Sequence, residues 1–343
     1  MTPPLRTLPR LLLPLLAAGL SLVPGAASAA APGPAAPGAT GVDVNAAQAG
    51  RALPARTYGV VSVTGLNFGT PNPDLARQLS WAAARPSALQ LSVNVALVVG
   101  GAYWGKGGPR RCAAGASSPA STACAYDYGW TGAQAAVAWT RAAGLPRTRE
   151  VQWWIDVESA SSWVDESPAL NRAAVQGVRD ALRHSGAASS VGIYTLGSEW
   201  STIVGAAPDL ATLPVWANGG AGSSLAKARA VCSRTSPTGG PIVQGQSGGR
   251  DGSTALDVDA VCPVAVAAPG RLSRAGALAL HGTVLPGTRV TLTVAQHGRR
   301  TRAYATTASA LGTWRVTARG LSPRLAATVT IAHGRRVVAA AAG

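Results

Sequence analysis

Two carboxylates end an apolar run in a chain that has only 14 acidic residues among 343. The run from Glu150 to Glu158 reads E-V-Q-W-W-I-D-V-E. In a β-strand, alternate side chains face the same side, so Trp154, Asp156 and Glu158 would share one face. Neighbouring carboxylates raise each other's proton affinity, so one can serve as a general acid while the other stays charged. Cleavage of a glycosidic bond needs this division of roles, although a D-x-E triplet can equally be a helix cap or a surface group.

Polar and aromatic residues on other strand-like runs are candidates to meet these carboxylates. Aromatic faces and amides suit a sugar ring, which stacks on its apolar side and forms hydrogen bonds at its rim. A tryptophan on such a run can equally belong to the core. The candidate substrate-binding residues are Asn94, Trp154, Tyr194, Trp216, Gln244 and Gln246, and the candidate catalytic residues are Glu158, Asp156 and Asp257, with Asp259 on the same run as Asp257.

Strand-like and helix-like patterns alternate along residues 57–263. Period-two or apolar runs predict strands, and 3.6-residue periodicity predicts helices. A βαβα rhythm over about 200 residues favours an α/β fold, a TIM-like (β/α) barrel of parallel strands whose active site lies at their C-terminal ends. The predicted strands are 58–64, 89–97, 151–158, 191–195, 213–218, 241–246 and 255–261, and the predicted helices are 73–84, 131–144 and 168–183.

Residues 268–343 have a different composition, with eleven arginines and no acidic residue. About seven short alternating runs separated by turn glycines predict a small all-β immunoglobulin-like sandwich. Its arginines could hold an anionic wall polymer such as a teichoic acid. Nucleic acid is a less favoured partner because no supporting motif or aromatic platform accompanies the charge. The alternative is a basic composition set by codon bias, without any anionic partner.

The first 29 residues have the pattern of a signal peptide. Arg6 and Arg10 precede an apolar run, and Ala27 to Ala29 read A-S-A, a small-residue cleavage site. This pattern predicts a secreted, extracellular protein, and a retained anchor is the alternative. Residues 30–56 are rich in Ala, Pro and Gly and predict a flexible linker. No later stretch has the roughly 20 apolar residues that a membrane span requires, so no span is expected after signal cleavage.

The four cysteines are Cys112, Cys124, Cys232 and Cys262. An even number in an exported chain predicts disulfides, for which three pairings exist. We favour Cys112–Cys124 and Cys232–Cys262, because each pair closes one Gly/Ser-rich loop, and each bridge would contribute roughly 3 kcal/mol. The spacings do not suit zinc. Neither a metal nor an organic cofactor is expected for the glycosidase chemistry.

A series of strand-end motifs carries a family resemblance. W-W-I-D-V-E, V-G-I-Y-T-x-x-x-E-W, P-V-W-A and I-V-Q-G-Q…L-D-V-D occur in this order within residues 57–263. The series resembles the family 25 glycoside hydrolases, lysozymes that cut the muramic acid linkage of peptidoglycan, and related secreted actinobacterial proteins with a glycoside-hydrolase-like barrel. The resemblance implies that Glu158 is the proton donor, that Asp156 and Asp257 are family aspartates, and that Gln244 is the glutamine of a W-Q-Y motif.

The sequence departs from that family at two places. The family's first strand usually reads Y-G-x-D, whereas this chain reads Y-G-V-V, so Val61 takes the place of an aspartate. Gly245 replaces the tyrosine of W-Q-Y.

Two functions follow as hypotheses. The first is a secreted glycosidase acting on peptidoglycan or another cell-wall polysaccharide by acid catalysis. The second is a cell-wall carbohydrate-binding protein whose barrel has lost turnover.

Overall fold

The computed structural model describes most of the chain from residue 34 onward, and these residues belong to one compact unit, Pro32–Gly343. The predicted signal peptide, residues 1–29, lies outside the described residues. No helix in the described segments is long and apolar enough to cross a membrane. The described segments are 34–55, 57–84, 89–98, 101–113, 115–116, 118, 121–146, 150–165, 167–248, 256–266, 272–334 and 337–341.

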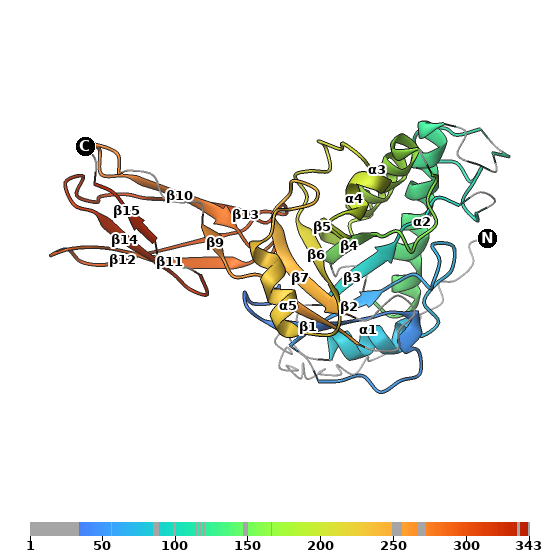
Figure 1. The fold of residues 1–343 in the computed structure, drawn as a ribbon, viewed down its shortest axis with the longest axis horizontal. Coiled ribbons are helices and arrows are strands. Elements are labelled where there is room, and N and C mark those ends of the chain that lie inside the picture. The colour runs from blue at the N-terminus through green and yellow to red at the C-terminus, as the bar shows by residue number, and fades with distance from the viewer. Residues whose placement is uncertain are drawn as a thin grey trace, which may run out of the picture. The chain divides into compact units, whose positions relative to one another are not determined.

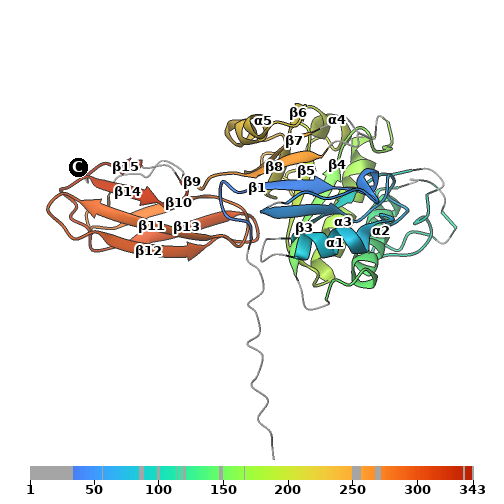
Figure 2. The same cartoon turned by 90° about the horizontal axis from the view of Figure 1, so that it is seen from below.

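Eight strands form a closed barrel in the order β1 to β8. Figure 1 labels β1 to β7, and Figure 2 labels β8. Neighbouring strands from β1 to β7 are parallel, whereas β8 is antiparallel to both β7 and β1. The prediction of a barrel is therefore confirmed, and the prediction that all its strands are parallel is wrong for β8. The strands are β1 Thr40–Val44, β2 Tyr58–Ser62, β3 Leu89–Asn94, β4 Val151–Val157, β5 Ala188–Thr195, β6 Val215–Ala221, β7 Ile242–Gly248 and β8 Asp257–Val261.

Strand β1 corrects the predicted linker. Residues 40–44 form this strand and Ala46–Gln48 a 3₁₀ turn, so the prediction that residues 30–56 are a flexible linker is wrong there. Both edges of β1 are hydrogen-bonded, to β2 on one side and β8 on the other, and this pairing compensates for weak local propensity. Gly41 is needed because the ring of Tyr58 lies against it, and a Cβ at Gly41 would be 2.5 Å from a ring carbon.

Five α-helices occur within the described residues (Figure 2). The Ser121 hydroxyl caps α2 by accepting from the Cys124 N–H, so α2 begins nine residues before the predicted start at 131. Pro168 occupies the first turn of α3, where its missing N–H costs no helical hydrogen bond. The helices are α1 Leu75–Ala83, α2 Thr122–Ala142, α3 Pro168–His184, α4 Glu199–Ile203 and α5 Leu225–Ala230.

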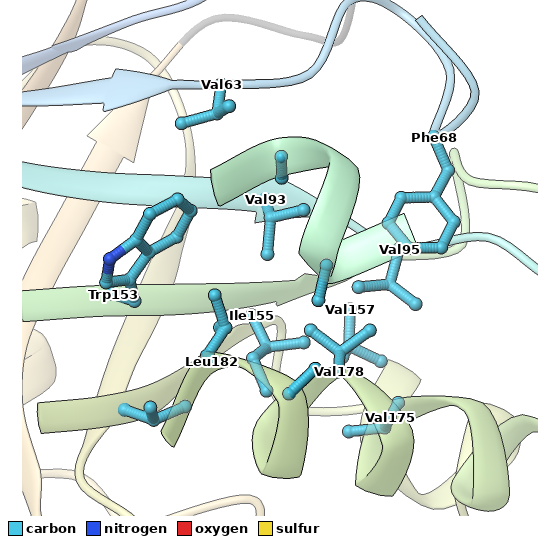
Figure 3. Packing of buried hydrophobic residues seen from close by; sticks show 14 of the residues in the cluster. Val63, Phe68, Val93, Val95, Trp153, Ile155, Val157, Val175, Val178 and Leu182 are labelled. Atoms are coloured by element: carbon cyan, nitrogen blue, oxygen red, sulfur yellow. The ribbon is translucent and has the colours of Figure 1, made fainter. Parts of the chain in front are cut away.

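Strand β4 divides its side chains as the alternation predicts. Trp153, Ile155 and Val157 are fully buried in the cluster that also contains Val178 and Leu182 of α3, as Figure 3 shows. Trp154 belongs instead to a second cluster, inside the barrel, with Tyr58, Tyr194 and Trp216. The apolar face of β4 therefore packs on the helices, and its other face points into the barrel, where Asp156 also lies.

The C-terminal region consists of two antiparallel sheets. One has the order β13-β10-β9 and the other β12-β11-β14-β15. Buried residues of both sheets, including Leu280, Leu292 and Trp314, form one hydrophobic cluster, so the sheets share a core. The described strands here are β9 Ala265–Val266, β10 Leu278–Thr283, β11 Arg289–Gln296, β12 Arg302–Thr307, β13 Thr313–Ala318, β14 Ala327–Ile331 and β15 Val337–Ala339.

Both predicted disulfides are present. Cys112 pairs with Cys124 and Cys232 pairs with Cys262. The first bridge ties the segment before α2 to the first turn of that helix. The second ties the 3₁₀ turn after α5 to the residue that follows β8.

Candidate active site

A cavity of about 190 Å³ opens at the end of the barrel where the parallel strands finish. Because β8 is antiparallel, its first residue, Asp257, lies at this same end. Four carboxylates therefore come from three separate parts of the chain to one place. The cavity is lined by Asp43, Asn45, Ser62, Gly65, Leu66, Ser92, Asn94, Asp156, Glu158, Ala160, Tyr194, Trp216, Asn218, Gln246 and Asp257.

Strand register brings the predicted residues to the cavity. Asn94 pairs with Asp156, Asp156 with Tyr194, and Tyr194 with Trp216, so these four lie at one level across β3, β4, β5 and β6. Glu158 follows one residue after the end of β4 and is half-buried. Of the nine predicted catalytic and substrate-binding residues, the seven that line the cavity are Asn94, Asp156, Glu158, Tyr194, Trp216, Gln246 and Asp257.

Trp154 and Gln244 do not line the cavity, and this corrects their predicted placement. Both are fully buried. The Trp154 indole N–H donates to Gln90 Oε1 at 2.6 Å inside the barrel. Both side chains point into the barrel. However, Trp154 lies two positions before the cavity residue Asp156, and Gln244 lies two positions before the cavity residue Gln246. Barrel interiors are filled by successive layers of side chains, and these two belong to a lower layer.

Asp43 is the functional candidate that the sequence analysis missed. It lies on β1 as the register partner of Asp257 on β8, and both line the cavity. The Gln246 amide bridges them, since Nε2 donates to Asp43 Oδ2 and to Asp257 Oδ2, each at 3.1 Å. The signal was present in the sequence as T-G-V-D-V, an alternating run with an aspartate on the same face as Gly41.

Val61, which the sequence analysis compared with a first-strand aspartate of the family, does not point into the barrel. It lies on β2 and is fully buried in the cluster that faces the helices, outside the barrel interior. Tyr58 and Val60 of the same strand face inward. On β1, Thr40 to Asp43 read T-G-V-D, which shares the glycine and the aspartate of Y-G-x-D but not its tyrosine. Val61 was compared with a first-strand aspartate, whereas it lies on the second strand of the barrel.

The environment of the cavity favours the protonated form of two acids. Enclosure by the barrel raises the pKa of Asp43 well above its usual value, and the nearby charges of Asp257 and Glu158 raise it further, while the hydrogen bond from Gln246 opposes the rise. Burial, followed by the charges of Asp43 and Asp257, likewise raises the pKa of Asp259. Asp259 lies beneath the cavity and accepts a hydrogen bond from Trp216 Nε1 at 2.9 Å.

A chain of hydrogen bonds fixes the orientation of the Gln246 amide. Gly220 N–H donates to Asn218 Oδ1 at 2.7 Å, and Asn218 Nδ2 donates to the Tyr194 hydroxyl at 2.7 Å. The Tyr194 hydroxyl then donates to Gln246 Oε1 at 2.8 Å. Because Oε1 accepts this bond, Nε2 must point toward Asp43 and Asp257. Such aligned donors and acceptors polarise and strengthen one another.

Tyr194 lies at the centre of the acidic cluster. Burial raises the pKa of Tyr194 well above its usual value, and the charges of Glu158, Asp156 and Asp43 add to the rise. A neutral phenol thus remains a hydrogen-bond donor throughout the physiological pH range. Its ring centroid is 4.3 Å from that of Trp216, and both residues line the cavity.

The loop after β4 is held by hydrogen bonds to its backbone. The Glu158 carbonyl oxygen accepts from Trp163 Nε1 at 2.7 Å and from Ser161 N at 3.1 Å. Ser161 Oγ also donates to Asn94 Oδ1 at 2.9 Å, and Glu199 of α4 accepts from the Ser159 backbone N–H at 2.9 Å. These contacts fix the backbone from which the Glu158 carboxylate projects.

Comparisons with known proteins give no family. No family model matches the chain, and no curated protein matches it. Among solved structures, the chain matches the crystal structure of an engineered protein with 14% sequence identity over 84% of this chain and 86% of the other, at a TM-score of 0.27. A TM-score this low carries no argument about fold or function.

Proposed function

We propose that the chain is a secreted glycoside hydrolase that acts on peptidoglycan or another cell-wall polysaccharide by general acid catalysis. The observation that carries the proposal is the convergence of Asp43, Asp156, Glu158 and Asp257 on one cavity at the strand ends of the barrel. Barrel enzymes place their catalytic groups at this end. We interpret the fold as a variant of the TIM-like (β/α) barrel, followed by an immunoglobulin-like sandwich, which agrees with the resemblance to family 25 glycoside hydrolases.

Each carboxylate has a role in this mechanism. Glu158, which is half-buried and lies just beyond β4, donates a proton to the oxygen of the leaving sugar. Asp156 stabilises positive charge at the anomeric carbon or on a ring intermediate and sets the proton affinity of Glu158. Asp257, held by the Gln246 amide, positions water or substrate. No cofactor takes part in this scheme.

Asp43 supplies a further carboxylate in the cavity, whereas the binder hypothesis assumed that one carboxylate was missing there. Its raised pKa keeps it protonated further toward neutral pH than an ordinary aspartate, so it can donate a hydrogen bond to a sugar oxygen. The hypothesis of a degenerate, non-catalytic barrel rested on Val61, which faces the helices. Because Asp43 lies in the cavity, the argument for a non-catalytic barrel no longer holds, and we favour the glycosidase.

The size and lining of the cavity suit one sugar ring of a longer polymer. About 190 Å³ is less than the roughly 300–1,000 Å³ of pockets that enclose a drug-sized ligand. One ring would therefore enter the cavity, against Tyr194 and Trp216, while the rest of the chain extends along the rim. Asn94 and Asn218 offer amide groups to its hydroxyls.

Export is part of the proposal. Two formed disulfides favour an oxidising compartment, and the first 29 residues have the signal-peptide pattern. Both fit an extracellular protein associated with the cell wall, where its substrate is located.

The test is the release of reducing ends from purified, insoluble peptidoglycan. Glu158→Gln removes the proton donor without changing its size, and we expect a rate loss of about 10²- to 10⁴-fold. Glu150→Gln is the matched control, because Glu150 is exposed and precedes the same strand at its opposite end; it should retain the wild-type rate. Turnover that is unchanged in Glu158→Gln would contradict the mechanism, and wild-type binding without any product would favour the carbohydrate-binding alternative.

A further inference from the structure

Positive charge is segregated in this chain. Residues 57–263 contain 15 Lys and Arg against 13 Asp and Glu, whereas residues 268–343 contain eleven Arg against no acidic residue. A codon bias toward arginine would not by itself remove every carboxylate from one domain. Because no Asp or Glu follows residue 259, no arginine of this region can pair with a carboxylate side chain of its own domain.

Three of these arginines line one groove on the C-terminal sheets. Arg299 and Arg300 lie in the turn between β11 and β12, and Arg302 begins β12. The opposite wall is the segment Gly320–Pro323, which Arg319 precedes and Arg324 follows. All five arginines are exposed, and Arg299, Arg300 and Arg302 line one wall of a cavity of about 920 Å³.

The walls of the groove are tied together by hydrogen bonds. Gln296, buried on β11, donates through Nε2 to the Ser322 and Leu325 carbonyl oxygens, each at 2.8 Å, and accepts from the Ser322 N–H at 2.7 Å. Arg302 Nη1 donates to the Arg319 carbonyl oxygen at 2.8 Å. The backbone walls of the groove are therefore fixed before any ligand arrives, so binding orders only the exposed arginine side chains.

The chemistry of the groove selects among anionic partners. Single-stranded nucleic acid is bound by aromatic platforms for its bases, but the only aromatic side chain of the groove is Tyr304, whose hydroxyl donates to the Arg319 carbonyl oxygen. Insertion into a membrane surface uses exposed apolar side chains, and Val338 is the only exposed large hydrophobic residue among the described residues of this domain. Guanidinium groups bind phosphate oxygens with paired hydrogen bonds and need neither feature.

We propose that this groove binds a linear polymer of phosphodiester-linked polyol units, held by Arg299, Arg300 and Arg302 through its phosphates. The volume of the groove and the three arginines along one of its walls favour a polymer over a single phosphate ion. Counterions released from the polymer then drive the association. The inference does not depend on hydrolysis by the barrel: a protein with Glu158→Gln should bind the polymer as the wild type does, whether or not the proposed glycosidase activity exists.

The test is binding of the full-length mature chain to immobilised poly(glycerol phosphate) between 50 and 200 mM salt. Arg299→Gln/Arg300→Gln removes two groove charges, and we expect affinity at low salt to fall about tenfold and the salt slope to decrease by about 1.4 to 2. The matched control is Arg274→Gln/Arg289→Gln, which removes two exposed arginines that do not line the groove. This control should retain most of the affinity and of the salt slope.

Three results would overturn the proposal. Equal losses in the two double variants would show that diffuse charge, and not the groove, binds the polymer. Undiminished binding in Arg299→Gln/Arg300→Gln would exclude the groove outright. Tighter binding to a single-stranded DNA oligonucleotide or to phosphatidylglycerol vesicles than to poly(glycerol phosphate), compared at equal phosphate concentration, would replace the proposed ligand by nucleic acid or membrane.

Discussion

Two buried glutamines, one in the barrel and one in the C-terminal sheets, each make three side-chain hydrogen bonds, but they bind different kinds of group. Gln246 donates to two carboxylates and accepts from a phenol, all of them side chains. Gln296 donates to two backbone carbonyls and accepts from a backbone N–H. The first amide therefore holds chemical groups in a cavity, and the second holds a loop in place.

The same contrast extends to the two interiors. The barrel encloses acids and amides, including Asp259, Gln244 and Gln246, at the centre of its strands. In the C-terminal sheets the described buried residues are apolar apart from Thr288 and Gln296, and the described arginines of that region are exposed. Burying ionisable groups costs free energy that an apolar core would not. We infer that the barrel keeps these groups for chemistry, whereas the sheets use their outer surface for binding.

The largest expected effect separates the two glutamines. Gln246→Leu removes the donor shared by Asp43 and Asp257. We expect glycan hydrolysis to fall about 10- to 100-fold, because a hydrogen bond to a charged group contributes about 1.5–3 kcal/mol. Polymer binding should be unchanged. Gln296→Leu should do the reverse, weakening polymer binding by loosening the 320–325 segment while hydrolysis stays at the wild-type rate.

Circular dichroism of both variants should show a retained fold, so that rates are compared per folded molecule. If either substitution impaired glycan hydrolysis and polymer binding equally, the proposed contrast would be wrong, because the two amides would then act only on global stability.

A smaller effect distinguishes two buried tryptophans. Trp216 Nε1 donates to Asp259 Oδ1, whereas Trp314 Nε1 has no hydrogen-bond partner within the described residues. Both indoles are nearly inaccessible to solvent, so Phe substitution leaves similar cavities. Trp216→Phe should reduce the free energy of unfolding by about 1–2 kcal/mol more than Trp314→Phe, because it also leaves a buried carboxylate without its donor. Urea unfolding of the full chain, followed by far-UV circular dichroism, measures both; equal losses would contradict the assigned hydrogen bond.

The smallest expected effect is a pH dependence with opposite signs at two acids. Burial and neighbouring charges raise the folded pKa of Asp259, so its contribution to stability is complete below the unfolded value near 3.9 and is lost as pH rises through the folded pKa. Asp259→Asn should therefore raise Tm relative to the wild type at pH 7 more than at pH 4.

Asp209 is the matched case of opposite sign. Partial burial raises its pKa, but hydrogen bonds from Arg179 and Gln176 outweigh burial and leave the pKa below its ordinary value. Its stabilising contribution is present above pH 4 and is lost as pH falls through the folded pKa. Asp209→Asn should lower Tm by a few degrees at pH 7 and have less effect at pH 3. Thermal melts that show the same sign for both acids would contradict the two environments.

Strand alternation and turn chemistry made much of the fold predictable. The separation of Trp153 from Trp154 follows from the two-residue period of a strand, and the disulfide pairs followed from two short loops. The layer at which an inward side chain lies was not predictable, because it depends on register between strands. Trp154 and Gln244 were therefore assigned to the cavity although they lie below it.

Strand β1 escaped prediction for a different reason. Composition averaged over residues 30–56 is dominated by Ala, Pro and Gly, which conceals a five-residue strand. That strand is stabilised by neighbours that follow it in the sequence, with Asp43 opposite Val60 on β2 and opposite Asp257 on β8. Closure of a barrel needs such a strand, but closure is a tertiary constraint that no local window contains. Asp43 was therefore missed as a site residue, and Val61 of β2 was compared with a first-strand aspartate.

The most direct test of the central claim, that Asp43 completes a working group of carboxylates, compares Asp43→Ala with Val61→Ala in the release of reducing ends from peptidoglycan. Asp43→Ala removes a cavity group, whereas Val61→Ala shortens a side chain that faces the helices. The account predicts a loss of about 100-fold in kcat/KM for Asp43→Ala and a wild-type value for folded Val61→Ala. Full turnover in Asp43→Ala would contradict it.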